Sequence, residues 1–151
     1  MAKFTLGLQS RIIVNTLVGK GYSNKLVEYE NEDGKLEQIN IATCFKRIIV
    51  DSMKKVFHPF NVAFFELIGA NIFPVHRRYL RNTDRLKNHL QSLIDDRRKS
   101  PTDSSDLLTI LINSENYKND DELMRHDMFV FFLAGMKTIQ ISTTNMIYYM
   151  E

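Results

Sequence analysis

One short segment inside an apolar stretch, Ala134-Gly135-Met136-Lys137-Thr138, carries residues whose types and spacing could do chemistry. A glycine within a helix costs about 1 kcal/mol relative to alanine, so its presence suggests that another group approaches the backbone closely. Thr138 places a hydroxyl one helical turn after Ala134. Such a hydroxyl either bonds back to the Ala134 carbonyl or serves a bound group. The segment is therefore the first candidate site.

The other side chains that could react or bind metal are weaker candidates. Cys44, the one cysteine, falls on the apolar stripe of a predicted helix, where a buried packing role is expected. No glycine-rich loop surrounds it, so it is a poor candidate for a thiolate ligand. The four histidines share no i, i+4 spacing, which argues against a metal site among them; they are His58, His76, His89 and His126.

The candidate segment lies in the last and longest predicted helix. The helical pattern runs from Asp120 to Glu151 without a proline, and Asp120 or Asp121 supplies an acidic N-cap. Residues 129–136 are apolar around the whole circumference, which is typical of a helix buried on all sides. The pattern continues to Glu151 without a C-cap glycine, so we expect the chain to end inside this helix.

Other amphipathic segments predict an all-α fold. The clearest runs from Ile41 to Phe57, with apolar residues at the three-four spacing of one buried stripe. His58 precedes Pro59 and should lie at a helix boundary, because the residue before proline disfavours the α conformation. Further helices are expected at residues 4–17, 79–98 and 107–112. We expect residues 1–151 to form a single helical fragment of a larger domain.

The polar segment from Tyr22 to Asn40 allows two interpretations. Asp33-Gly34 lies between Leu26-Val27 and Leu36 and could form the turn of a small hairpin. The apolar alternation on either side is poor. A surface loop is therefore the favoured interpretation.

Composition places the chain in the ordinary globular class. It has 151 residues, 44% of them hydrophobic and 25% charged, with a formal net charge of +2. The segment His76–Lys99 holds eight Lys or Arg against three Asp, a local net charge of +5. A solvated helix face is favoured there over contact with phosphates, and no nucleic-acid partner is expected. Residues 128–150 are apolar, but Lys137 and several polar residues disfavour a membrane span, and no signal segment is present.

The candidate segment and its surroundings resemble the long central helix of the cytochrome P450 heme-thiolate monooxygenases. The family pattern A-G-x-[D/E]-T corresponds to Ala134 through Thr138, with Phe129-Val130-Phe131-Phe132-Leu133 directly before it and Asp120-Asp121-Glu122-Leu123 at the helix start. Upstream segments also match in order and spacing; they are Phe73-Pro74 followed by Arg77-Arg78, Leu86 to Arg98, and Asp106-Leu107-Leu108. The resemblance covers roughly Ile41 to Glu151, and weakly the first forty residues.

The resemblance implies a heme-dependent monooxygenase that inserts one oxygen atom into an apolar small molecule. Ala134 and Gly135 would let the helix pass close over the porphyrin. Thr138 would lie beside the oxygen bound to iron and help to hold a proton-delivering water. Phe132 and Leu133 would face the substrate pocket.

Two motifs of the family have no counterpart after Thr138 in this sequence. They are the glycine-rich F-x-x-G-x-x-x-C segment, whose cysteine ligates the heme iron, and the E-x-x-R pair. In the family both follow the central helix. Because thiolate ligation decides the chemistry of such a heme, we expect an internal fragment that is inactive alone.

Lys137 departs from the family pattern, which usually has Asp or Glu at this position. An ammonium group cannot accept a proton, although burial could lower its pKa enough to free a lone pair. Alternatively, Lys137 points away, toward solvent or a carboxylate. The substitution leaves the heme placement intact as a hypothesis and puts the usual proton relay in doubt.

The resemblance also implies partners for the full enzyme. Phe60–Phe73 would form a lid over the substrate channel, where Phe64, Phe65, Leu67 and Ile68 would meet an apolar substrate or a membrane surface; core packing is the alternative. An electron-donating reductase is expected, with membrane association at the endoplasmic reticulum. A different class of function stays open, a small helical protein-interaction module without catalysis.

Overall fold

A computed structural model describes residues 12–20, 22, 25–63, 73–101, 105–118 and 120–150 of the chain. At Phe60, Asn61, Met136, Lys137 and Gln140 it describes the backbone alone. The structure is mostly helical, which confirms the predicted fold class. Residues 26–88 form one compact unit, and residues 1–25 with 89–151 form the other.

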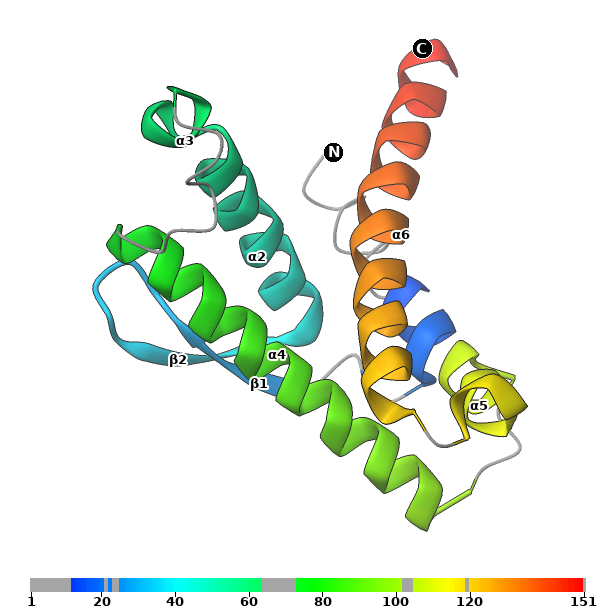
Figure 1. Cartoon of the computed structure of the whole chain (residues 1–151). Coiled ribbons are helices and arrows are strands. Elements are labelled where there is room, and N and C mark those ends of the chain that lie inside the picture. The colour runs from blue at the N-terminus through cyan, green and yellow to red at the C-terminus, as the bar shows by residue number, and fades with distance from the viewer. Residues whose placement is uncertain are drawn as a thin grey trace. The chain divides into compact units, whose positions relative to one another are not determined.

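The first unit begins with a β-hairpin, so the interpretation of this segment as a surface loop was wrong. Strands β1 (Leu26–Glu30) and β2 (Leu36–Asn40) pair antiparallel, with Glu30 opposite Leu36 (Figure 1). Gly34 takes a positive φ of 77° in the turn, a conformation that favours glycine. Alternation exists on one strand only, where Val27 and Tyr29 are 3% and 4% exposed. The hairpin is therefore packed against the rest of its unit through the apolar face of β1.

Helix α2 (Ile41–Val56) follows the hairpin directly and confirms the predicted amphipathic helix. Asn40 caps it, since its side-chain oxygen accepts a hydrogen bond from Thr43 N at 2.8 Å. Its buried face includes Ile41, Cys44, Phe45 and Ile48. The helix ends before His58-Pro59, as expected, and a short helix α3 (Pro59–Ala63) comes next. The predicted lid residues Phe64, Phe65, Leu67 and Ile68 lie outside the described residues.

Helix α4 (Pro74–Lys99) is continuous over 26 residues, and the division between the two units falls within it. Proline suits its first position, where the missing N–H would have no helical partner. Leu86, Leu90, Leu93 and Ile94 are fully buried and confirm the predicted apolar stripe.

The second unit combines the end of α4 with residues 12–18, which are helical, and with α5 (Leu107–Asn113), the 3-10 turn η3 (Glu115–Tyr117) and α6 (Asp121–Met150). Gly19, at a φ of 90°, follows the helix of residues 12–18. Asp120 is the N-cap of α6, because its carboxylate accepts a hydrogen bond from Leu123 N at 2.9 Å.

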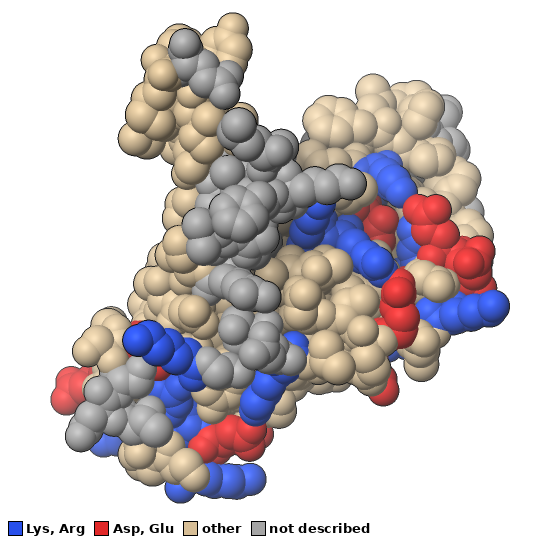
Figure 2. All heavy atoms as spheres, turned by 180° about the vertical axis from the view of Figure 1, so that it is seen from behind, with Lys and Arg blue, Asp and Glu red and all other residues tan. Residues whose placement is uncertain are grey.

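Helix α6 buries one side only in its first half, and its second half is largely exposed. Met124, Met128, Phe129 and Phe132 are buried. Other apolar residues of α6 are exposed, so this chain alone does not cover the helix on all sides; they are Leu123, Val130, Phe131, Ile139, Ile141, Met146, Tyr148, Tyr149 and Met150. In Figure 2 the end of α6, at the upper left, shows no charged side chain. None of the described helices is long and apolar enough to cross a membrane.

Candidate functional site

The predicted site on α6 opens into an apolar groove. Phe131, Ala134, Gly135, Thr138 and Ile139 form one wall, and they follow the spacing of a single helix face. The helix of residues 12–18 forms the opposite wall. Its lining residues are Ile12, Ile13, Thr16 and Leu17. The groove has a volume of about 380 Å³.

Thr138 lies exposed on this groove with its hydroxyl bonded to its own helix. Its Oγ1 donates to the Ala134 carbonyl at 2.7 Å, with a longer contact of 3.4 Å to the Gly135 carbonyl. A hydroxyl has one proton to donate and two lone pairs to accept with. The back-bonded geometry therefore leaves the oxygen of Thr138 able to accept a hydrogen bond from the groove.

Gly135 is less crowded than the sequence suggested. A Cβ built at this position would lie 4.0 Å from Ile13 Cγ2, an ordinary van der Waals distance. Among the described residues, no side chain or backbone of this chain approaches Gly135 closely enough to require glycine. The close approach that motivated the prediction stays untested.

Phe132 and Leu133 are not brought to the groove. Phe132 is fully buried, Leu133 is half-buried, and neither lines the groove with Thr138. Phe131 lines it instead, because it stands one turn before Ala134 and two turns before Thr138 on the same face. That spacing was a signal that sequence reasoning overlooked. The substrate role of Phe132 and Leu133 stays a prediction.

The opposite wall could not be found from the sequence. Thr16 and its neighbours precede α6 by more than a hundred residues, and their apolar pattern names no partner helix. Lys137, the departure from the family pattern, is described through its backbone alone, so its predicted behaviour stays untested.

Cys44 and the histidines provide no metal ligand set. Cys44 is fully buried, and burial raises the pKa of its thiol to about 12, so the thiolate that iron binds does not form there at neutral pH. Burial, with the nearby Lys25 charge, lowers the pKa of His89. The described residues contain no cluster of three or more His, Cys, Asp or Glu able to hold a metal ion.

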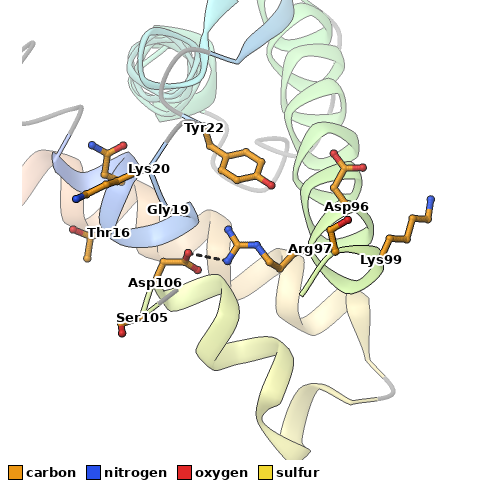
Figure 3. A pocket seen from close by; sticks show the side chains of 11 residues that line it. Thr16, Gly19, Lys20, Tyr22, Asp96, Arg97, Lys99, Ser105 and Asp106 are labelled. Atoms are coloured by element: carbon orange, nitrogen blue, oxygen red, sulfur yellow. Dashed lines mark hydrogen bonds and ion pairs between the residues drawn. The ribbon is translucent and has the colours of Figure 1, made fainter. Parts of the chain in front are cut away.

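A second, polar cleft of about 860 Å³ lies at the other end of the helix of residues 12–18. Figure 3 shows its central feature, the guanidinium of Arg97 directed at the carboxylate of Asp106. Arg97 Nη1 donates to Asp106 Oδ2 at 2.8 Å, and Nη2 donates to the Val18 carbonyl at 3.0 Å. Arg97 also donates to Thr109 Oγ1. We call this arrangement of Arg97, Asp106 and the backbone at Val18-Gly19 the Arg97 clasp.

The Arg97 clasp is buried and its charges are paired. The side chains of Arg97 and Asp106 are 5% and 2% exposed. Burial alone would lower the pKa of Arg97, but the hydrogen bond and charge of Asp106 raise it. Asp106 also caps α5 by accepting from Thr109 N at 2.9 Å. The clasp joins α4, α5 and the helix of residues 12–18. Because Arg97 and Asp106 neutralise each other, neither charge is available for catalysis.

The unit of residues 26–88 carries a second ionic cluster, around Glu30. Arg81 and Arg85 donate to its carboxylate, at 2.8 Å from Arg81 Nε and 3.3 Å from Arg85 Nη1. The hydrogen bond from Arg81 is the largest cause that lowers the pKa of Glu30 to about 2. The Asn82 side chain bonds both the N–H and the carbonyl of Glu30. This cluster holds α4 against the hairpin.

The chain is mostly helical, and its longest helix presents small residues and a threonine to an apolar groove. These features fit the helical cytochrome P450 enzymes, to which the sequence is similar. The family model described as cytochrome P450 matches residues 27–151, most of the chain. The chain therefore belongs to the cytochrome P450 family.

Two curated relatives match shorter stretches. The bifunctional cytochrome P450/NADPH–P450 reductase ALT2 of Alternaria alternata is 31% identical over 77 residues, which cover 48% of this chain and 7% of the relative. A bifunctional cytochrome P450/NADPH–P450 reductase of Aspergillus oryzae is 34% identical over 67 residues, or 42% of this chain and 6% of the relative. The matched stretches are thus small parts of these relatives. No solved structure gave a significant match.

Proposed function

We propose that this chain is part of a cytochrome P450 monooxygenase that inserts one oxygen atom into an apolar organic substrate. Family membership supports heme-dependent oxidoreductase chemistry in general. The observation that carries the finer proposal is the stripe on α6, where Ala134, Gly135 and Thr138 line one apolar groove.

The residues of this stripe fit one face of a heme. Ala134 is exposed and ends in a methyl group, and Gly135 has no side chain, so a flat macrocycle could approach the helix there once the facing Ile13 gives way. Phe131 and Ile139 supply exposed apolar surface on either side. Cys44 would not hold the heme iron, because it is fully buried and the pKa of its thiol is raised. In this proposal the described residues would cover the heme and would not supply its iron ligand.

A thiolate-ligated heme supplies the oxygen-activating redox chemistry when bound. The role left to this chain is to order water and protons near the reacting oxygen. Thr138 suits that role, because its back-bonded hydroxyl presents an acceptor to the groove. Lys137 replaces the usual acid, so we propose that Thr138 takes its protons from water rather than from its neighbour.

The partners of the full enzyme belong to the same proposal. The names of both relatives join a P450 to an NADPH–P450 reductase, which supports a reductase as the electron donor here. The apolar groove suits an apolar small molecule better than a charged one. Association with the membrane surface at the endoplasmic reticulum, with the segment Phe60–Phe73 as the contact, follows from the family resemblance.

The test compares three variants in the full-length enzyme that contains this segment. Ala134→Phe should abolish heme uptake, because a benzyl group fills the space that the methyl leaves open. Thr138→Ala should keep the heme but lower the product formed per reductant by a factor of about 10². Thr144→Ala removes an exposed threonine of the same helix and should change neither quantity. The carbon-monoxide difference spectrum measures heme uptake, and the product yield measures the product formed per reductant.

Normal heme uptake by Ala134→Phe would contradict the proposal that this stripe covers the heme. The interaction-module alternative predicts no heme at all and a partner that binds the exposed end of α6. A full-length protein without a carbon-monoxide difference band would favour that alternative.

A further inference from the structure

The polar cleft beside the Arg97 clasp carries more positive charge than its own carboxylates neutralise. Three basic and two acidic side chains line it. Both acids already have cationic partners, since Asp106 pairs with Arg97 at 2.8 Å and Asp96 pairs with Lys25 at 3.2 Å. The cleft therefore has no described carboxylate left for its other two cations.

Those two cations are Lys20 and Lys99, and two serine hydroxyls accompany them. The side chains of Lys20, Lys99, Ser100 and Ser105 all line the cleft, and all four residues are exposed. None of the four side chains forms a hydrogen bond or an ion pair with another described residue. An ammonium group only donates hydrogen bonds, and a serine hydroxyl can donate one. The cleft thus offers unused donors together with positive charge.

The Arg97 clasp fixes the three chain segments that present these donors. Each donor lies within three residues of a member of the clasp. The pairs are Lys20 after Gly19, Lys99 and Ser100 after Arg97, and Ser105 before Asp106. Because Arg97 bonds both the Asp106 carboxylate and the Val18 carbonyl, the segments cannot separate without breaking a buried ion pair. A site held in this way loses little conformational entropy when a ligand binds.

Unused donors and positive charge are complementary to an anion that is rich in acceptors. A phosphate monoester carries a charge of about −2 and three acceptor oxygens, and lysine binds phosphate as a point charge. A carboxylate has a single charge and only two oxygens, so it would leave more of these donors unused. The cleft volume of about 860 Å³ is typical of small-molecule sites and leaves room for an organic group beside the phosphate.

We propose that this cleft binds the phosphate group of a phosphate monoester, with Lys20 and Lys99 as its charged ligands and the two serine hydroxyls as further donors. Figure 3 shows the two lysines on opposite sides of the Arg97–Asp106 pair, so they flank a phosphate that lies above this pair. The monoester is either a soluble metabolite or a phospholipid headgroup, and both present the same group. No residue of α6 lines the cleft, so the inference is independent of the proposed heme site.

The test measures binding of glycerol 3-phosphate by saturation-transfer NMR, with the 151-residue chain and with the full-length enzyme that contains it. Lys20→Gln and Lys99→Gln should each weaken binding by about tenfold, because each removes a charge-assisted hydrogen bond. Lys118→Gln is the matched control, since Lys118 is an exposed lysine of the same unit that does not line the cleft. It should leave the affinity unchanged. If the isolated chain does not fold, the full-length enzyme decides.

Competition and vesicle binding identify the source of the phosphate. Vesicles of equal parts phosphatidylcholine and phosphatidic acid are the lipid probe. Binding of glycerol 3-phosphate without vesicle binding supports a soluble ligand, whereas vesicle binding that both cleft variants weaken supports a lipid headgroup. In either case the proposal stands.

Three results would overturn the proposal. The first is that neither Lys20→Gln nor Lys99→Gln weakens binding to either probe. The second is an equal loss in Lys118→Gln, since the effect would then come from net charge and not from the cleft. The third is competition by inorganic sulfate that matches glycerol 3-phosphate itself, because the cleft would then hold an adventitious ion only.

Discussion

The Arg97 clasp and the apolar groove border the same short helix, residues 12–18, and each contains a glycine, but the two glycines serve different needs. At Gly19 a Cβ would lie 2.5 Å from Asp106 Oδ2, so the chain's own atoms require glycine there. At Gly135 a Cβ would make an ordinary 4.0 Å contact. The difference separates a glycine that this chain's own atoms require from one that the described residues do not require.

The buried ion pair of the clasp gives the largest expected effect. Arg97→Ala should lower the free energy of unfolding by about 3–5 kcal/mol, because it leaves the Asp106 carboxylate buried without its partner. Urea denaturation at neutral pH measures the loss. Lys25→Ala is the matched control, since the Lys25–Asp96 pair has side chains 42% and 53% exposed and should contribute at most about 1 kcal/mol.

Gly19→Ala tests the same clasp without removing a charge. The added methyl meets Asp106 Oδ2 at 2.5 Å, and the backbone φ of 90° disfavours a side chain. Unfolding should require less urea than in the parent chain. If Arg97→Ala were no worse than Lys25→Ala, or if Gly19→Ala were neutral, the clasp would not be the closed structural site described here.

The Glu30 cluster shows how partial exposure reduces an ionic contribution. The pKa of the Glu30 carboxyl is lowered to about 2 from an ordinary 4.5. The carboxylate therefore stabilises the fold above about pH 4.5, and this contribution is lost as the pH falls toward 2. Arg81, its principal partner, is 50% exposed, while Glu30 is 13% exposed. Allowing for solvent screening, we expect about 1–2 kcal/mol, less than for the clasp.

The measurement compares the parent chain with Glu30→Gln by urea denaturation between pH 7 and pH 3. The parent should be more stable at pH 7, and the difference should shrink as the pH falls below about 4.5, because only the parent loses a carboxylate charge. A difference that stays constant with pH would mean that the carboxylate charge contributes nothing measurable.

The contrast between the two sites also explains what the sequence could predict. Helix α2 and the Leu86–Ile94 stripe of α4 were predictable, because their apolar residues repeat at helical spacing. The hairpin was missed, since only β1 shows the alternation through Val27 and Tyr29 while its partner strand is largely exposed.

Of the candidate site, the α6 stripe was predictable from its motif, and the rest was not. Thr16 and the Arg97 clasp depend on pairings between segments distant in sequence, and a single threonine or arginine in a helical pattern carries no sign of its partner. Phe132 was chosen over Phe131 because helix phase cannot be fixed when every neighbouring residue is apolar. Burial resolves the phase, since Phe132 is buried and Phe131 is exposed.

Gly135→Ala gives the smallest expected effect and the sharpest contrast with Gly19→Ala. In the chain without heme it should raise the free energy of unfolding by up to about 1 kcal/mol, since alanine is the better helix former and its methyl meets Ile13 at an ordinary distance. In the full-length enzyme the same methyl would crowd a group that approaches the helix, so heme content should fall or stay level rather than rise. Urea denaturation of the chain and the heme-to-protein ratio of the enzyme measure the two effects. Destabilisation of the heme-free chain would mean that its own atoms already require glycine at this position, and the distinction between a closed clasp and an open groove would then be lost.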